Sequence, residues 1–208
     1  PAVDHHHIDG RPHHHDMTTT YQERPRKGGG TECLLANDTA PVWRKLLPIA
    51  LTAENAQKVH TGKKTQTRRL AKKSKHDGAF VARYRVGDVL WIQEPWRTHV
   101  CFNSVKPTEL NTSRVLFESD GKNDGGKLRP VRFLPLRFAR PDRYLVTEVR
   151  LERVMAISPE DIRAEGGRIC DAPRAWFHEL WNSIHAAPGS RFEDAPWVFA
   201  YTFRRIEP

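Results

Sequence analysis

The sequence has few cysteines, and their spacing argues against two kinds of site. Its 208 residues include Cys33, Cys101 and Cys170, which lie far apart and form no Cys-X-X-Cys pair. An odd number of scattered cysteines argues against a disulfide framework and against a zinc site built on thiolates. We therefore expect a reducing, cytoplasmic compartment and no cysteine-bound metal.

Long apolar runs are also missing from the sequence. No stretch approaches the roughly 18 apolar residues that a membrane-spanning helix needs. The chain does not open with a charged segment followed by an apolar one, so we expect neither a membrane partner nor a secretory signal. A hydrophobic fraction of 38% with six tryptophans is sufficient for one packed core, but not for two.

Negative charge is scarce relative to positive charge. Lys and Arg number 34 against 25 Asp and Glu, which gives a formal net charge of +9. A surplus of cationic side chains favours polyanionic partners, because each phosphate contact releases condensed counterions. A solvated basic surface without a specific partner is the alternative. Charge alone favours a nucleotide or a nucleic acid as the partner.

The first 16 residues hold six of the eleven histidines. Such a tract can bind metal, since neutral imidazole is a good ligand for zinc, copper or nickel. Met17 follows directly and has the position of a natural start, which favours a His-rich extension or tag over a metal site. These residues include one arginine and three aspartates, so the rest of the chain carries +11 rather than +9.

The remaining chain divides into a tail and a folded part. Residues 17–44 are polar, rich in Gly, Thr and Arg, and lack a periodic apolar pattern, which predicts a flexible arm. Residues 45–208 form the predicted domain. Its helices are expected at 53–60 after the N-cap Thr52, in a short segment capped by Ser158, and at 174–184.

The predicted strands outnumber the helices. Strands are expected at 46–51, 89–93, 114–118, 144–154 and 197–206, with an extended segment at 130–138. Many strands with a few short helices indicate an α+β fold with a small mixed or barrel-like sheet.

A basic segment follows the helix predicted at 53–60. It contains Lys64, Thr65, Thr67, Arg68 and Arg69 in one short stretch. Loops on a rigid scaffold are favoured places for sites, and in a strand Thr65 and Thr67 would share one face. An exposed basic loop with capping hydroxyls is the alternative.

A second segment ends the strand predicted at 89–93. Glu94 lies at that end, where a carboxylate could accept a hydrogen bond from a base edge. Trp96 could stack on a base. Both Trp91 and Trp96 are equally compatible with a core. The alternation of the strand predicts that Trp91 is buried and leaves Trp96 open.

A third segment ends the helix capped by Ser158. Glu165 is its last residue before Gly166 and Gly167. The helix dipole disfavours a carboxylate at this end, so either a nearby lysine or exposure to solvent must tolerate it. An exposed helix-end glutamate is the ordinary interpretation.

The three segments occur together and in this order in a known family. They resemble the ASCH proteins of phages and prophages, often labelled morphogenetic proteins, in the motifs GKKTQTRR, GDVLWIQEPW, ISPEDIRAEG, FHELWNSI and PWVFAYTFRRIEP. The similarity covers residues 46–208, and the combination is more specific than any one motif. The resemblance implies a PUA-like small β-barrel with flanking short helices and a cleft.

The resemblance also implies a catalytic set. Some small bacterial ASCH proteins are amidohydrolases that deacetylate N4-acetylcytidine, and other relatives are associated with RNA binding or cleavage. The catalytic lysine, threonine and glutamate of the amidohydrolases correspond here to Lys64, Thr67 and Glu165. The chain departs from them at Arg68, where they have an apolar residue, and in a longer insert at 97–143.

By this resemblance Lys64 is the expected base, Thr67 the nucleophile or water-positioning group, and Glu165 the acid and base. A lysine in a partly dry cleft loses its charge more easily, and a threonine hydroxyl needs such a base. A carboxylate can pass a proton to the leaving amine.

The substrate-binding set is expected around these three residues. Arg68 and Arg69 would hold phosphate or polarise a carbonyl, with Thr65 beside them. Glu94 and Trp96 would frame the base. No metal or other cofactor is needed.

Two other functions remain open from the sequence. In a binding module the basic segment and Trp96 hold RNA, or less favourably DNA, and Lys64 serves only as a phosphate contact. A phage assembly factor is the third alternative, and no residue supports it directly. The oligomeric state is left open.

Overall fold

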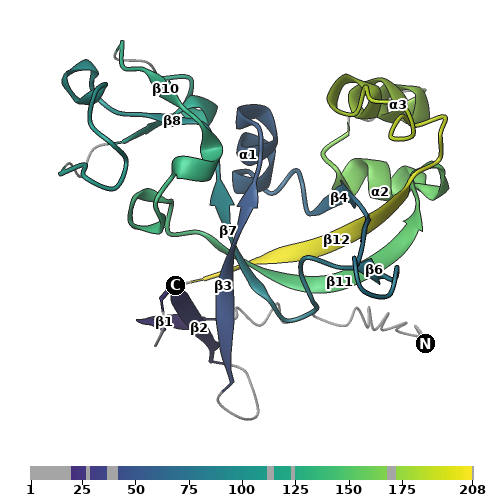
Figure 1. Cartoon of the computed structure of the whole chain (residues 1–208), viewed down its shortest axis with the longest axis horizontal. Helices are drawn as coiled ribbons and strands as arrows, with labels where there is room; N and C mark the ends of the chain where they lie inside the picture. Colours follow the sequence, from purple (N-terminus) through teal and green to yellow (C-terminus); the bar gives the residue numbers. More distant parts are fainter. Residues whose placement is uncertain are drawn as a thin grey trace, which may run out of the picture.

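The computed structural model describes residues 20–26, 29–36, 42–111, 115–122, 125–167 and 172–207. Seven strands form one sheet in the order β1-β2-β3-β7-β11-β12-β4 (Figure 1). These strands are β1 (Tyr21–Pro25), β2 (Thr31–Leu35), β3 (Trp43–Ala50), β4 (Gln66–Leu70), β7 (Val89–Gln93), β11 (Arg143–Arg153) and β12 (Trp197–Ile206).

The sheet is mixed because one connection crosses over. β3 and β7 are parallel, with Leu46 opposite Val89, and the connection between them contains α1 (Ala53–His60). A parallel pair requires such a crossover, whereas antiparallel neighbours need only a turn. The long strands β11 and β12 pair antiparallel, and β4 follows on the far side of β12.

The predicted flexible arm is wrong where the structure describes it. β1 pairs with β2, and β2 pairs with β3, so this segment extends the sheet. Cys33 and Leu35 are buried against Leu46 and Trp91 in one apolar cluster. The arm has weak local preference for a strand, and pairing with β3 supplies the missing stabilisation. Residues 1–16 lie outside the described part of the chain.

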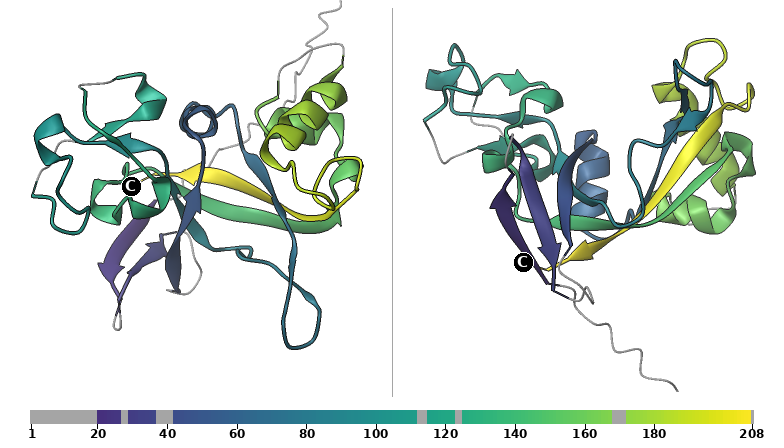
Figure 2. Two further views of the ribbon diagram at one scale, coloured as in Figure 1. Left: turned by 45° about the horizontal axis from the view of Figure 1, so that its top comes forward. Right: turned by 60° about the horizontal axis from the view of Figure 1, so that its bottom comes forward.

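The three α-helices agree with the sequence prediction. Thr52 caps α1 by accepting from the amide of Asn55, and Ser158 caps α2 (Pro159–Ala164) by accepting from the amide of Asp161. The third helix, α3 (Pro173–Ile184), buries Phe177 and Trp181. Figure 2 shows α2 and α3 together at the far end of β11 and β12.

The insert at 97–143 forms its own small substructure beside α1. It contributes to a three-stranded sheet in the order β10-β8-β9. The strands are β8 (Trp96–Arg97), which begins just before the insert, β9 (Leu116–Phe117) and β10 (Leu128–Arg129). The insert also contains 3-10 turns at Val100–Phe102, Glu118–Asp120, Val131–Phe133 and Leu136–Phe138. The extended segment predicted at 130–138 is therefore wrong, since prolines at 130 and 135 each open a 3-10 turn.

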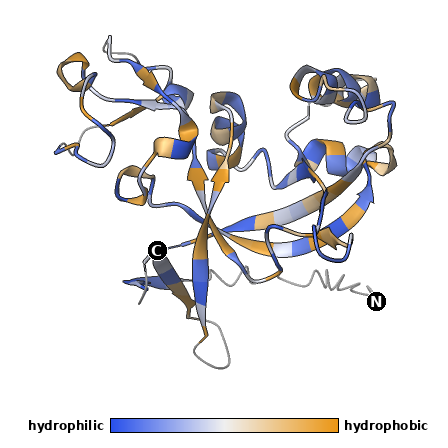
Figure 3. Ribbon diagram, in the orientation of Figure 1, coloured by the Kyte–Doolittle hydropathy of each residue, from blue (hydrophilic) through white to orange (hydrophobic). Residues whose placement is uncertain are grey.

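A short hairpin completes the fold. β5 (Lys72–Lys73) pairs with β6 (Phe80–Val81), and a 3-10 turn at Val154–Ala156 follows β11. Apolar residues run along the central strands (Figure 3), where Ile49, Leu90 and Val146 are buried in one cluster.

The α+β class predicted from the sequence is confirmed. A closed barrel is not formed by the described residues, because the sheet order runs from β1 to β4 without a pairing between these two strands. No helix within the described ranges is long and apolar enough to cross a membrane.

Candidate active site

The segment that carries Lys64 is held against the end of α2. Gly62 turns the chain with a positive φ of 72° after α1. The amide of Thr65 then donates to the carbonyl of Ala164 at 2.8 Å. Gly166 has a positive φ of 81°, and a Cβ there would lie 3.4 Å from the Cβ of Lys64. Backbone contacts therefore hold together two segments that lie about one hundred residues apart in the sequence.

Lys64 and Glu165 form a buried ion pair. Their side chains are only 3% and 6% exposed, and the Lys64 ammonium donates to the Glu165 carboxylate. It also donates to the Glu165 backbone carbonyl at 2.9 Å. Burial lowers the pKa of Lys64, and the attraction of Glu165 opposes that shift. Lys64 thus provides the neighbouring cation that the helix-end carboxylate requires.

Arg68 contacts the other side of Glu165. Its Nη1 lies 3.3 Å from a Glu165 carboxylate oxygen. Its Nη2 lies 2.7 Å from Glu152 and 2.6 Å from Asp161, and Arg150 shares Asp161. This guanidinium is 1% exposed and contacts three carboxylates, so its charge is largely compensated within the protein. That Arg68 holds phosphate or polarises a carbonyl stays a prediction, and its observed contact is with a Glu165 carboxylate oxygen.

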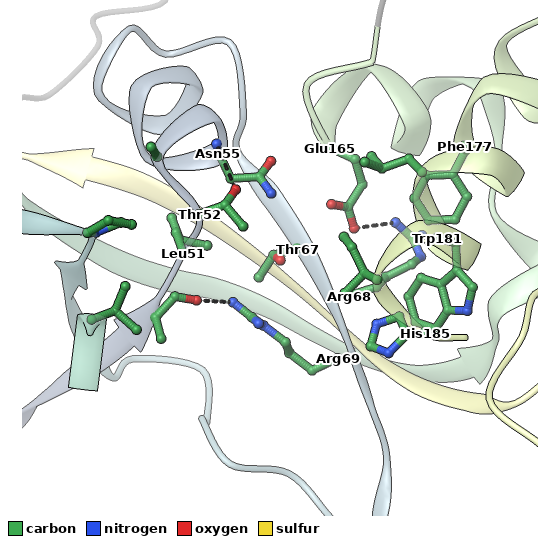
Figure 4. A pocket seen from close by; sticks show the side chains of 16 residues that line it. Leu51, Thr52, Asn55, Thr67, Arg68, Arg69, Glu165, Phe177, Trp181 and His185 are labelled. Carbon is green, nitrogen blue, oxygen red and sulfur yellow. Dashed lines mark hydrogen bonds and ion pairs between the residues drawn. The ribbon is translucent and has the colours of Figure 1, made fainter. Parts of the chain in front are cut away.

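Thr67 and Glu165 line one pocket of about 390 Å³, here called the Thr67 pocket. Figure 4 shows Thr67 on β4 between the beginning of α1 and Glu165. The helix α3 supplies an apolar wall, which includes Phe177 and Trp181. This volume lies within the range of about 300–1,000 Å³ found for small-molecule sites. The remaining lining residues are Ala50, Leu51, Thr52, Ala53, Asn55, Arg68, Arg69, Pro95, Val131, Leu180, Ile184 and His185.

Lys64 itself lines a different pocket, of about 270 Å³, together with Thr65 and Tyr144. Glu165 therefore lies between the Lys64 ammonium and the Thr67 pocket. Thr65 is exposed and precedes β4, whereas Thr67 is buried within it. The condition under which Thr65 and Thr67 would share one face of a strand is not met, because the strand begins only at Gln66.

Arg69 lies at the edge of the Thr67 pocket. Its Nη2 donates to the carbonyl of Ala50 at 2.6 Å (Figure 4), which ties β4 to the end of β3. Unlike Arg68, its side chain is exposed. Arg69 is therefore the arginine of this segment that remains available to an anionic ligand.

Glu94 lies outside the Thr67 pocket in a closed network. It is 1% exposed, and its carboxylate accepts from His60 at 3.0 Å and from Arg140 at 2.9 Å. Ser119 donates to its other oxygen. Burial raises the pKa of Glu94, but the hydrogen bonds from these three donors together lower it by more. The net shift of the pKa is therefore downward. The structure does not support the prediction that Glu94 accepts from a base edge.

Trp96 is also displaced from its predicted role. It is fully buried, with Phe138 against one side and the Arg129 guanidinium over its ring. A base has no access to either face in this arrangement, so Trp96 packs the core beneath the insert. Trp91 is buried, as the alternation predicts.

The sequence analysis missed the aromatic wall of the pocket. Trp181 lies on α3 and His185 caps its C-terminus, with ring centroids 4.2 Å from each other. The signal available in the sequence was the spacing of four residues between the tryptophan and a histidine at the end of the predicted helix.

Within the described ranges, no three His, Cys, Asp or Glu residues are placed to hold a metal ion. The site therefore consists of a buried lysine–glutamate pair, an orienting arginine and a threonine in an aromatic-walled pocket. This arrangement defines a candidate site for acid–base chemistry on a small organic group.

No protein-family model matches the sequence, and no curated protein matches it. The solved structures that are similar to it include the following two. A protein of Enterococcus faecalis V583 from the DUF984 family is 12% identical, with a TM-score of 0.42 over 79% of this chain and 77% of that one. An ASCH domain from Lactobacillus crispatus JV V101 is 14% identical, with a TM-score of 0.42 over 77% of this chain and 79% of that one.

Proposed function

We propose that this protein is an amidohydrolase that removes the acyl group from an N4-acylated cytosine nucleoside or nucleotide. One observation carries the proposal: Glu165 is buried, paired with Lys64, and lines the same pocket as Thr67. The resemblance of the sequence motifs to ASCH amidohydrolases supports the same three residues. The aromatic side chains of Trp181 and His185 give a cytosine ring a surface for stacking.

The proposed reaction begins at Thr67. Its hydroxyl oxygen bonds to the acyl carbon while Glu165 accepts the hydroxyl proton. Glu165 then returns this proton to the exocyclic N4 nitrogen as the carbon–nitrogen bond breaks, which leaves a free cytosine amine and an acyl ester on Thr67. Water hydrolyses the ester, releases the carboxylic acid and restores the hydroxyl.

Lys64 acts in this scheme through Glu165. Because burial lowers the pKa of Lys64, its proton is more readily shared with the carboxylate than that of an exposed lysine. Arg68 holds the second carboxylate oxygen, which limits the orientations of Glu165. The sequence-based role of Lys64 as a direct base is thereby revised to a proton-sharing partner of Glu165.

The test is incubation of the full chain with N4-acetylcytidine, followed by chromatography of cytidine. We expect turnover that Glu165→Gln and Thr67→Val each reduce by about 10²–10⁴-fold, the range for positioned acid–base groups. Thr67→Ser should retain part of the activity and allow an acyl-enzyme to be seen by mass spectrometry.

Neighbouring residues supply matched controls. Lys63 and Thr65 are exposed and adjoin the proposed residues in sequence. Lys63→Met and Thr65→Val should keep full activity, while Lys64→Met should lose it. Thermal unfolding of each variant separates a loss of chemistry from a loss of fold. Absence of turnover by the wild-type protein across several N4-acyl cytidines would overturn the proposal.

A nucleic-acid-binding module is the second candidate, favoured by the net charge of +9. It would give affinity for RNA that falls steeply with salt and no product. Titration of single-stranded RNA at 50 and 200 mM salt, with the hydrolysis assay beside it, distinguishes the two functions.

A further inference from the structure

A second hollow adjoins the Thr67 pocket. It has a volume of about 280 Å³ and shares Ala50 and Arg69 with that pocket. We call it the Arg83 hollow. Its remaining lining residues are Leu70, Lys72, Val81, Arg83, Tyr84, Phe199 and Tyr201. The hydrogen bond from Arg69 to the Ala50 carbonyl therefore lies where the two hollows meet.

The Arg83 hollow is cationic. Arg69, Lys72 and Arg83 line it, and no acidic residue does. The less exposed arginines Arg68, Arg140 and Arg150 contact carboxylates, whereas the three cations of this hollow are exposed. In the described part of the chain, no ion pair involves any of the three cations of this hollow.

The three cations come from neighbouring segments of the chain. Arg69 lies on β4, Lys72 on β5, and Arg83 two residues after β6. All three residues are exposed and line the same hollow. Like charges held near one another repel, and a bound anion would offset this repulsion.

The floor of the hollow is rigid. The Tyr84 hydroxyl donates to the carbonyl of Pro48 at 2.7 Å, and the Tyr201 hydroxyl accepts from the amide of Arg83 at 3.0 Å. The two rings meet edge to face with centroids 5.1 Å apart. A site whose supporting groups are fixed in this way loses little entropy when a ligand binds.

We propose that the Arg83 hollow binds a phosphate of the molecule whose base occupies the Thr67 pocket, so that the substrate is a nucleotide unit rather than a free nucleoside. The identity of the base rests on the proposed function; the preference for phosphate does not. A planar guanidinium group can donate two parallel hydrogen bonds to the oxygens of one phosphate, and a lysine adds a positive point charge. A free nucleotide and a nucleotide within RNA present the same chemistry to this hollow.

The test compares ligands that differ by one phosphate. Calorimetric titration of the full chain with cytidine, cytidine 5′-monophosphate and cytidine 3′-monophosphate should show at least a tenfold preference for one monophosphate. Inorganic phosphate should compete with the monophosphate. Arg83→Ala and Lys72→Ala should each weaken nucleotide binding at least fivefold, and the double variant should bind nucleotide no better than nucleoside.

Lys75 provides the matched control. It lies in the same β5–β6 hairpin, is exposed, and does not line the hollow. Lys75→Ala should keep the preference for nucleotide. If Lys75→Ala weakens binding as much as Arg83→Ala does, the effect is one of general charge and the proposal is overturned.

The outcomes separate this inference from the proposed function. Preference for the monophosphate without hydrolysis of any N4-acyl compound retains the phosphate site and removes the enzyme. Hydrolysis of N4-acetylcytidine with equal affinity for cytidine and both monophosphates overturns the phosphate site. A trinucleotide that binds more tightly than the monophosphate, with loss of that gain in Arg83→Ala, identifies a polynucleotide as the source of the phosphate.

Discussion

Two buried glutamates of this protein occur in contrasting settings. Glu94 and Glu165 are 1% and 5% exposed, and each contacts a cation and further hydrogen-bond donors. Glu165 also lines a pocket of about 390 Å³, whereas the hollow beside Glu94 is lined by its partners His60, Ser119 and Arg140.

The partners of the two carboxylates explain this difference. Glu94 is enclosed by His60 from α1 and by Ser119 and Arg140 from the insert, so that its network fastens the insert to α1. Glu165 contacts Lys64 through one carboxylate oxygen and Arg68 through the other, and it lines the Thr67 pocket. Burial and charge pairing are therefore common to both carboxylates, and what distinguishes Glu165 is that it lines a pocket.

The largest expected contrast is in catalysis. Glu165→Gln should lower kcat/KM for N4-acetylcytidine by about 10²–10⁴-fold, because the amide cannot accept the Thr67 proton. Glu94→Gln should change it less than threefold in the folded fraction. Steady-state kinetics of both variants at matched folded concentration, verified by circular dichroism, provide the measurement. An equal loss of kcat/KM in the two variants would show that the two glutamates do not differ in their contribution to catalysis.

For stability, the larger effect is expected at Glu94. Glu94→Ala leaves Arg140 and His60 with a lost partner in a buried network, and removal of one member of such a pair costs about 3–5 kcal/mol. We expect a loss of this size in the free energy of unfolding, measured by urea titration. Glu109→Ala is the control, because Glu109 also belongs to the insert and its side chain is 60% exposed. A change below about 1 kcal/mol for Glu94→Ala would contradict a fastening role.

His60 makes the stability of the Glu94 network depend on pH. Burial lowers the pKa of His60, but hydrogen bonds from its ring to Asp142 and Glu94 outweigh burial and raise it overall. Hydrogen bonding to His60 lowers the pKa of Asp142, and the net shift of Glu94 is also downward. Arg140 and Arg205 face the same carboxylates, and Tyr144 contacts the ring at 3.2 Å.

The signs of these shifts define a pH window. The stabilisation from a histidine with a raised pKa is present below about pH 6.5 and is lost as the pH rises through the folded value. The carboxylates contribute above about pH 4.5 and lose their contribution as the pH falls through their lowered values. Urea midpoints should therefore be highest between these limits and fall toward pH 9. In His60→Asn the fall above pH 6.5 should be smaller, and parallel curves would exclude this coupling.

The smallest expected effect is at Ser119. Its hydroxyl donates to Glu94, and hydrogen bonds to charged groups contribute about 1.5–3 kcal/mol. Because His60 and Arg140 remain, Ser119→Ala should cost about 1–2 kcal/mol of stability and leave kcat/KM unchanged. Ser183→Ala, on the exposed side of α3, is the comparison. A stability loss as large as that of Glu94→Ala would make the hydroxyl, and not the charge, the main contact.

Most regular elements could be predicted because their signals are local. Thr52 and Ser158 mark the beginnings of α1 and α2 by their side-chain caps. The strand at Trp197–Ile206 has a long run of apolar and aromatic residues. The strands β1 and β2 were missed because they lie in a segment that is polar overall, and their stability comes from the pairing of β1 with β2 and of β2 with β3.

The site was predicted in part. The resemblance of the motifs selected Lys64, Thr67 and Glu165, and the structure brings Lys64 and Glu165 into contact and places Thr67 and Glu165 on one pocket. The ligand-binding roles of Arg68, Glu94 and Trp96 could not be judged from sequence. Each has a residue type suited to a ligand, and only the packing shows that their polar or aromatic faces are already occupied.

The sequence by itself determined the composition of this protein, its basic charge, its capped helices and the α+β class, because these depend on residues close together along the chain. Tertiary structure alone decided which carboxylate opens onto a pocket and which arginine remains free of carboxylates. Those outcomes depend on contacts between residues as far apart as Lys64 and Glu165, whose backbone segments are joined by the hydrogen bond from Thr65 to Ala164. No local pattern encodes that contact, since its free energy arises only when β4 and α2 pack together.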